Sequence, residues 1–171
     1  MMTIDEKDQK TLFDRSVYIS KEIQAALPSS YLIRPLRRDD DERGFVELLS
    51  QLSIVGSITQ ESFRDRFDLL KQQGSTYIIV IEEDNKIVAS ATLLVEYKFL
   101  RKCGIVGHIE DVVVHDSQRG KKLGIRLIDQ LHYIAQAVKC YKTILNCNEK
   151  NISFYEKCFL KKTDVQMTRY F

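Results

Sequence analysis

The sequence contains little proline or glycine, with two prolines and seven glycines in 171 residues, too few for a linker-rich or low-complexity chain. It also lacks long apolar stretches. The longest nearly apolar one, residues 77–81, has the length of a strand, whereas a membrane-spanning helix needs roughly 20 residues. The first ten residues are charged and have no apolar core, which argues against a secretory signal peptide. We therefore expect one soluble domain of ordinary size with no membrane partner.

There is no excess of charge of one sign. The 26 basic and 24 acidic residues leave a net charge of +2, which is too balanced for a protein that binds nucleic acid through bulk charge. The four cysteines, Cys103, Cys140, Cys147 and Cys158, form no CxxC pair, so we expect no metal site. Without a secretory signal we expect no disulfides either. The composition predicts a cytoplasmic chain with reduced thiols and no nucleic-acid partner.

The spacing of the apolar residues predicts alternating helices and strands in the first two thirds of the chain. A weak helical pattern covers residues 4–26 and is stopped by Pro28. Residues 31–34 form a strand that should lie at a sheet edge, since Pro35 has no N–H to donate. Two helices follow, one over about 39–52 and one from Thr59 to Gly74. The strand patterns at 77–81, 87–99 and 105–114 then predict an antiparallel meander.

The last third continues with a helix over about residues 122–138, a strand at 141–147, a short helix at 150–158 and a final strand at 165–170. The inward face of the long helix should consist of Leu123, Leu127, Leu131, Ile134 and Ala135. This order of elements predicts an α/β fold in which a mixed, mostly antiparallel sheet carries helices on both faces.

The segment RGKKLG, residues 119–124, lies between a strand and an amphipathic helix. Such a junction directs unpaired backbone N–H groups, and the positive end of the helix dipole, at one point. Gly120 and Gly124 let a ligand approach the backbone closely. Mobile positive charge comes from Arg119, Lys121, Lys122 and Arg126. The segment predicts a site for an anion such as a pyrophosphate, although a solvated basic helix start has the same pattern.

The preceding strand, GHIEDVVV at residues 107–114, does not alternate regularly. Neighbouring strand residues face opposite sides of a sheet, so Glu110 and Asp111 can both reach solvent only if the strand is bulged or splayed. A carboxylate directed into the protein is costly without a partner. We therefore expect an irregular central strand here, with an exposed edge strand as the alternative.

A strand, an Arg/Gln-x-x-Gly-x-Gly loop and a helix in this order resemble the acetyl-CoA signature of the GCN5-related N-acetyltransferase (GNAT) superfamily. Lys122 stands where the superfamily pattern has a glycine, which is compatible if Lys122 keeps ordinary helical angles. The stretches 33–36, 55–59, 107–111, 140–151 and 154–158 resemble one family within it, the enzymes that acetylate glucosamine 6-phosphate. The resemblance runs over about residues 31–169. It implies a GNAT fold, splayed at the central strands, in a domain at 29–171 that follows a helical extension at 1–28.

The resemblance also implies where acetyl-CoA, the co-substrate, is bound. The pantetheine arm would lie along the backbone of Val112, Val113 and Val114 like an added strand. The remaining residues implied for the cofactor are Arg119, Gly120, Lys121, Lys122, Leu123, Gly124, Ile125, Asn151 and Tyr155. The residues implied for glucosamine 6-phosphate are Ser53, Lys98, Arg101, Glu110, Asp111, Asn146 and Arg169. In the family the final strand crosses to a second subunit, where the basic residue matching Arg169 reaches the partner's sugar phosphate, so the resemblance implies a homodimer.

The implied reaction is direct attack of the sugar amine on the thioester within a ternary complex. Tyr155 matches the tyrosine that donates a proton to the departing thiolate. Family members often carry a carboxylate where this chain has Asn146, and an amide cannot act as a base. Three possibilities remain for the removal of the amine proton: Glu110 accepts it, a water chain accepts it, or the amine arrives already neutral. The alternatives to this function are the same fold acting on a protein or other small-molecule amine, and a non-catalytic acyl-CoA sensor.

Overall fold

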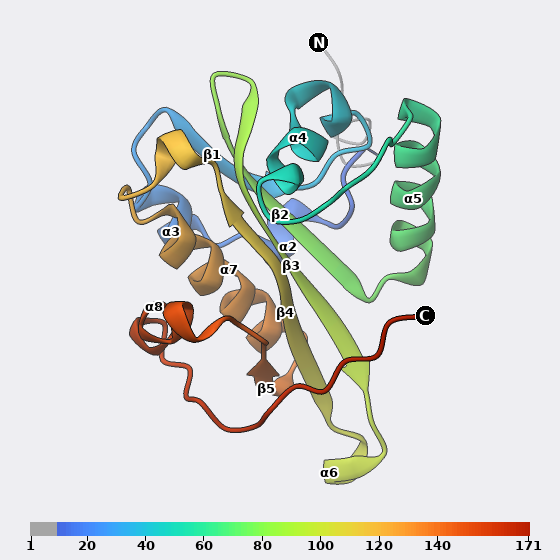
Figure 1. Cartoon of the computed structure of the whole chain (residues 1–171), viewed down its shortest axis with the longest axis vertical. Helices are drawn as coiled ribbons and strands as arrows, with labels where there is room; N and C mark the ends of the chain where they lie inside the picture. The colour runs from blue at the N-terminus through green and yellow to red at the C-terminus, as the bar shows by residue number, and fades with distance from the viewer. Residues whose placement is uncertain (1–9) are drawn as a thin grey trace.

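The computed structural model of the chain describes residues 10–171, which form one five-stranded sheet (Figure 1). The strands lie side by side in chain order: β1 Tyr31–Pro35, β2 Thr76–Glu83, β3 Lys86–Tyr97, β4 Ile105–Val114 and β5 Cys140–Ile144. The first four pair antiparallel and β5 pairs parallel to β4. The predicted edge strand, the meander and the mixed, mostly antiparallel sheet are confirmed.

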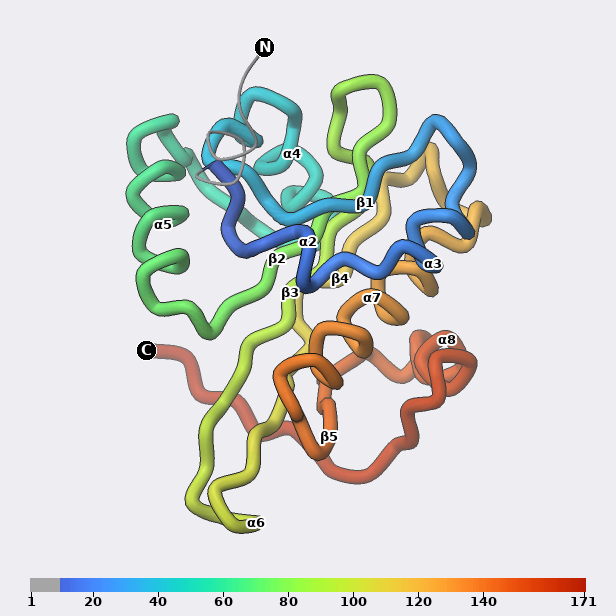
Figure 2. Tube along the Cα trace, turned by 180° about the vertical axis from the view of Figure 1, so that it is seen from behind, coloured from blue at the N-terminus to red at the C-terminus, as the bar shows by residue number. Residues whose placement is uncertain are grey.

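Helices cover both faces of the sheet, as predicted (Figures 1 and 2). On one face, α4 Phe45–Ser50 and α5 Gln60–Gln73 pack over a buried cluster that includes Phe63, Phe67 and Val80. On the other face, α7 Leu123–Ala137 packs over a second cluster that includes Ile79, Leu93 and Ile109. The same side holds the short helices α2 Arg15–Tyr18, α3 Lys21–Ala25 and α8 Ile152–Lys157. No helix in the described part of the chain is long and apolar enough to cross a membrane.

Two of the predicted helices form for the reasons that their sequences indicate. Thr59 accepts the N–H of Ser62 at the start of α5, and Gly74 ends that helix at a φ of 66°. In α7 all five predicted inward residues are buried. Local capping therefore determines the ends of α5, and a sustained period of 3.6 residues determines the buried face of α7.

The helix predicted over residues 39–52 is wrong in its extent. Gly44 adopts a φ of 84° and divides the segment into a 3-10 turn, Asp40–Arg43, and α4. The reason is tertiary: the buried carboxylate of Asp40 accepts two N–H groups of Arg34, at 2.7 and 2.8 Å. Arg34 lies in β1, so the turn is tied to the sheet and cannot continue as a regular helix.

The N-terminal segment differs from the single helix predicted over residues 4–26. Its described part forms α2 and α3, separated by Ile19 in extended conformation, while residues 4–9 lie outside the described residues. Buried Gln130 of α7 accepts the N–H of Ser20 and donates to the carbonyl of Tyr18. Ile19 and Leu27 belong to the main core cluster, so this segment packs as part of the body.

The C-terminal elements are shorter than predicted. A 3-10 turn, Glu149–Asn151, precedes α8, and the strand predicted at 165–170 has no ladder partner among the described residues. Its side chains are exposed along the whole segment. An extended segment needs a neighbouring strand to satisfy its backbone groups, and residues 10–171 do not provide one.

Candidate active site

An irregularity in β4 shapes the centre of the candidate site. In the pairing of β3 with β4, Thr92 faces Glu110 and Ser90 faces Val113, so Asp111 and Val112 together oppose one residue. Asp111 takes a positive φ of 51°, a conformation that aspartate tolerates better than most residues. This is a β-bulge, and the irregular strand predicted from the adjacent carboxylates is confirmed.

The bulge changes which side chains face which helices. Before it, Ile109 packs in the cluster under α7; after it, Val112 and Val114 pack against that same cluster, and Val113 lies under α4 and α5. A regular strand would send even and odd positions to opposite faces throughout. Because the alternation slips by one residue, Glu110 and Asp111 both project on the α4 and α5 side, where both are exposed.

The other side of β4 opens at the same level. The parallel pairing with β5 ends at His108 opposite Ile144, so the β5 side of residues 109–114 has no strand neighbour in the described chain. The sheet is therefore splayed at its central strands, as predicted. An extended ligand can pair with backbone groups of Val112, Val113 and Val114 as an added strand does.

The strand leads directly into a turn rich in unpaired N–H groups. After a 3-10 turn at Asp116–Gln118, Gly120 has a φ of 83° and Lys122, the N-cap of α7, has φ 62° and ψ 15°. No side chain caps α7, and the N–H groups of residues 120–125 have no acceptor among the described residues. The condition under which a lysine fits the superfamily pattern, ordinary helical angles at Lys122, is not met, because the residue is left-handed where the chain turns into the helix. The unpaired N–H groups at this helix start have the geometry that can hold an anion.

Tyr155 is brought next to this turn by the packing of α8. A β-carbon on Gly124 would lie 3.1 Å from Cζ of Phe154, so the glycine lets α8 approach the start of α7 closely. The ring of Tyr155 packs edge-on to Phe154, with centroids 4.9 Å apart. Tyr155 is half-buried, and this burial, followed by the nearby thiols of Cys147 and Cys158, raises the pKa of its hydroxyl group.

The segment between β5 and α8 carries the other residues implied near the thioester. Asn146 and Cys147 are exposed. The side chain of Asn148 accepts the N–H of Lys150 at 3.3 Å and caps the 3-10 turn, and Asn151 occupies the N-cap position of α8. Asn146, Asn151 and Tyr155 thus lie on one short stretch that follows the end of β5.

Polar side chains line the α5 side of the sheet near Glu110. Partial burial, then the charge of Asp111, raises the pKa of Glu110. His108 lies two residues before Glu110 on the same face of the sheet. Its Nε2 lies 2.8 Å from the carboxylate of Glu96, which also accepts a hydrogen bond from Lys98 Nζ at 2.6 Å. These two contacts, that of Lys98 first, lower the pKa of Glu96. His108 therefore satisfies a hydrogen bond with Glu96 at this position.

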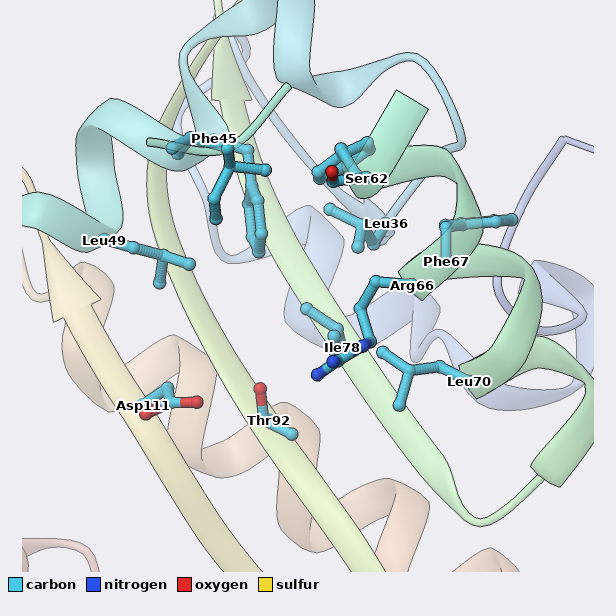
Figure 3. A pocket seen from close by; sticks show the side chains of 13 residues that line it. Leu36, Phe45, Leu49, Ser62, Arg66, Phe67, Leu70, Ile78, Thr92 and Asp111 are labelled. Carbon is cyan, nitrogen blue, oxygen red and sulfur yellow. The ribbon is translucent and has the colours of Figure 1, made fainter. Parts of the chain in front are cut away.

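A cavity of about 390 Å³ lies between the sheet and the α4–α5 side (Figure 3). Asp111 of the bulge and Thr92 of β3 border it, and apolar side chains of α4 and α5, among them Phe45 and Phe67, form most of its wall. Arg66 of α5 extends into it toward the sheet. The sequence analysis did not single out Arg66 or Thr92, because ordinary amphipathic positions give no signal of a cavity.

Of the seven residues implied for the sugar, Asp111 alone lines this cavity among the described residues, and three of the others lie on separate segments. Ser53 is exposed just after α4. Arg101 lies in α6 Leu100–Cys103, at the far end of the β3–β4 hairpin (Figure 1), with its guanidinium over the Tyr141 ring. The six residue steps from Ile105 to Asp111 span roughly 20 Å of strand. Arg169 lies on the exposed C-terminal segment and packs over Phe171.

Comparison with known proteins agrees with this geometry. The sequence model described as the acetyltransferase (GNAT) family matches residues 21–159. The chain is 47% identical over 140 residues to glucosamine 6-phosphate N-acetyltransferase 1 of Dictyostelium discoideum, covering 80% of this chain and 88% of that protein. It is 43% identical over 148 residues to the glucosamine 6-phosphate N-acetyltransferase of Arabidopsis thaliana, covering 85% and 99%.

The three-dimensional comparison gives the same result. The crystal structure of glucosamine-6-phosphate N-acetyltransferase from Arabidopsis thaliana matches with a TM-score of 0.82 at 44% identity, covering 84% of this chain and 99% of that one. An acetyltransferase from Trypanosoma brucei matches with a TM-score of 0.78 at 34% identity, covering 82% and 99%. The expected GNAT fold is confirmed. The chain belongs to the acetyltransferase (GNAT) family, in the branch that contains the glucosamine 6-phosphate N-acetyltransferases.

Proposed function

We propose that this protein transfers the acetyl group of acetyl-CoA to the 2-amino group of glucosamine 6-phosphate. The observation that carries the proposal is the bulge in β4. It places two carboxylates on the cavity side of the sheet and leaves the opposite strand edge free, directly before a turn of unpaired N–H groups. Donor and acceptor can therefore meet from two sides at one strand. The relatives named above have this activity in their names.

The donor is held by backbone geometry. The diphosphate of acetyl-CoA binds the N–H groups of residues 120–125, and the pantetheine arm pairs with Val112, Val113 and Val114. This pairing directs the thioester toward the bulge. No large excess of basic charge is needed, because the oriented N–H groups and the helix dipole supply the positive potential locally.

The chemical step is one displacement within the ternary complex. The neutral amine nitrogen attacks the thioester carbon, an N–C bond forms and the C–S bond breaks. The nitrogen releases one proton, the hydroxyl group of Tyr155 donates a proton to the thiolate, and the tyrosinate is then reprotonated from solvent. Burial raises the pKa of Tyr155, so its hydroxyl group is protonated at neutral pH and able to donate. Thiolate charge develops only in the transition state, where this donation has its effect.

The amine has to lose a proton before or during attack. Asn146 has no basic atom, which leaves the two carboxylates that the bulge brings to the acceptor side, and of these Glu110 has a raised pKa, caused first by partial burial. We assign Glu110 to orient the amino sugar and to accept this proton. An amino group beside electron-withdrawing oxygens titrates lower than lysine, as an α-amino group does at about 8, so a weak base is sufficient.

We also propose that two chains share each site as a homodimer. Arg101 lies at the far end of the β3–β4 hairpin and Arg169 on the C-terminal segment, and the same segments expose large apolar side chains, among them Phe99, Leu100 and Met167. The C-terminal segment has no strand partner among the described residues, so exchange with a second copy would satisfy its backbone. Sedimentation at micromolar concentration should show twice the 19.9 kDa chain mass; a single chain-sized species contradicts the dimer.

Mixing two inactive variants tests whether the site is shared. Arg101→Ala and Glu110→Gln should each lose activity. If the arginine of one subunit serves the carboxylate of the other, a mixture that exchanges subunits contains restored sites and recovers about a quarter of the wild-type activity. No recovery after verified exchange shows that one chain supplies both residues.

A cytoplasmic location completes the proposal. The four cysteines are free thiols in the described chain, and three of them are at least partly accessible to solvent, as suits a reducing compartment. Microscopy of a fluorescent fusion tests this, and enrichment in a secretory or membrane fraction overturns it.

The proposed activity is tested by thiol release from acetyl-CoA with three acceptors measured in parallel. We expect turnover with glucosamine 6-phosphate, much less with glucosamine, and none with a lysine peptide, because the relatives named above carry activity on glucosamine 6-phosphate in their names. A preference for the peptide shows that the acceptor is a protein amine. CoA binding without turnover on any amine shows that the protein is an acyl-CoA sensor.

A further inference from the structure

The turn at residues 119–124 has to satisfy two requirements that conflict. Its N–H groups must remain unpaired in order to bind an anion, so helix and strand hydrogen bonds cannot hold its shape. The turn nevertheless contains Gly120 and Lys122 at positive φ, and a lysine there is strained because its β-carbon crowds the backbone. The shape must therefore be held by side chains that anchor it from outside.

Two such anchors lie on either side of Gly120, and both end on a buried tyrosine of β1. The hydroxyl group of Tyr31 lies 2.8 Å from Gln118 Oε1 and 2.8 Å from Lys121 Nζ. Lys121 Nζ also donates to Gln118 Oε1 at 2.5 Å, so the three groups form a closed triangle. Tyr31 is 4% exposed, which makes its position a property of the core.

The triangle is extended to the sheet through a fourth side chain. Gln118 Nε2 donates to Glu83 Oε2 at 2.6 Å, and Glu83 is the residue opposite Tyr31 in the pairing of β1 with β2. The ends of two neighbouring strands thus hold the side chains of residues 118 and 121. The side chain of Tyr31, at the start of the edge strand β1, is connected to the turn by this route.

Lys121 therefore has a different role from the mobile charge expected from the sequence. Its ammonium group lies 5.6 Å from the centroid of the Tyr31 ring, and the hydrogen bond with Tyr31, with the charge of Glu83 as a weaker contribution, raises its pKa. The side chain is exposed, yet its ammonium group is held against Tyr31 of β1. What it offers a ligand is its backbone N–H, held in place.

We infer that Tyr31 is a positioning residue for the acetyl-CoA site, which fixes the phosphate-binding turn through Gln118 and Lys121. The inference rests on the proposed binding of the CoA diphosphate to residues 119–125. Tyr31 makes no contact with the ligand; it restricts the turn to the conformation in which the N–H groups converge. Binding of the diphosphate then costs less ordering of the loop.

Tyr31→Phe tests the inference, because it removes one hydroxyl group and changes no charge. The lost hydrogen bonds should raise the Kd for CoA, measured by calorimetry, and the KM for acetyl-CoA roughly 3- to 10-fold. The KM for the amino acceptor and the turnover at saturating acetyl-CoA should stay at the wild-type level. Tyr133→Phe on α7, a tyrosine 38% exposed and distant from the turn, is the matched control and should change neither constant.

A second variant separates positioning from a general loss of stability. Gln118→Ala breaks the triangle from the loop side, and should raise the Kd for CoA to a similar extent. The double variant should be little worse than either single one, since both act through the same contacts. Additive losses, or a rise in both KM values together with a lowered thermal midpoint, overturn the inference.

The same measurements distinguish failure of the inference from failure of the underlying site. If wild-type protein binds pantetheine as tightly as CoA, the turn does not bind the diphosphate and the proposed site is wrong. If CoA binds far more tightly than pantetheine, but Tyr31→Phe and Gln118→Ala keep the wild-type Kd, the site stands and the positioning role of Tyr31 is wrong.

Discussion

Replacing Tyr155 by phenylalanine tests the proposed departure of the thiolate. The variant keeps the aromatic ring, so the edge-on contact with Phe154 at 4.9 Å is retained and the affinity for acetyl-CoA should be unchanged. What is lost is a hydrogen bond to a group that carries charge in the transition state, which contributes about 1.5–3 kcal/mol. At about 1.4 kcal/mol for each factor of ten, turnover should fall roughly 10- to 150-fold.

The pH dependence of this loss follows from the environment of Tyr155. Burial raises the pKa of the hydroxyl group above its ordinary value of 10.0, so it stays protonated throughout the neutral range. The loss should therefore be constant between about pH 6 and 9, well below that pKa. The assay is single-turnover thiol release, with the Kd for CoA measured separately.

A matched variant and one clear outcome make the test decisive. Tyr133→Phe removes a hydroxyl group from the more exposed tyrosine of α7 and should leave turnover unchanged. If Tyr155→Phe keeps full turnover in the single-turnover assay, Tyr155 does not protonate the leaving group. If instead only the Kd for CoA rises, the hydroxyl group binds the cofactor and plays no part in the transition state.

Three further predictions use the geometry directly. Gly124→Ala places a β-carbon 3.1 Å from Phe154, so α8 must shift, and turnover should fall several-fold because Tyr155 is displaced. Gly74→Ala is the control: it is a strained substitution far from the site and should lower the thermal midpoint but leave turnover intact. Because the pKa of Glu110 is raised, the acid limb of the rate profile should lie above the ordinary glutamate range of about 4.3; Glu110→Gln should abolish that limb, and an unchanged profile would mean that the amine arrives neutral. Asp40→Asn leaves the 1% exposed Arg34 with Glu82 as its remaining anionic partner and should lower the free energy of unfolding by about 1–3 kcal/mol, as read from urea titration, with activity per folded molecule unchanged.

The parts of the fold that the sequence predicted well are those determined by local pattern. The meander follows from three runs of strand residues at short spacing, and α5 follows from a threonine cap and a terminal glycine. The bulge was predictable because Glu110 and Asp111 are adjacent in a strand that also needs three buried or half-buried valines. No regular strand meets both demands.

The parts that were predicted wrongly depend on contacts distant in sequence. The segment predicted as one helix over 39–52 is divided at Gly44, because Asp40 is bound to Arg34 of β1. The predicted N-terminal helix is divided because the side chain of Gln130 in α7 forms hydrogen bonds with the backbone of Tyr18 and Ser20. Neither partner can be identified from spacing, since each is an ordinary polar residue within another element.

The candidate site shows the same division. Residues on one continuous stretch, such as the turn at 119–124, were located by motif. Arg66, Thr92 and Tyr31 come from separate elements and carry no motif, so only the structure brings them to the cavity or to the turn. Neither the sequence motifs nor the structure of one chain brings the final strand and Arg169 to the site. The C-terminal segment lacks a ladder partner among the described residues.

One inserted residue in β4 connects this fold to its chemistry. If the strand were regular in the register set by Ile109, Asp111 would point into the apolar cluster under α7, and Val112 and Val114 would turn to the cavity side. A buried, unpaired carboxylate costs several kcal/mol, more than the left-handed φ of a single aspartate. The bulge is therefore the less costly arrangement, and it has two consequences at once: both carboxylates face the acceptor side, and the valine backbone diverges from β5 where the thioester arm would pair. Acceptor recognition and donor binding thus depend on the same backbone feature.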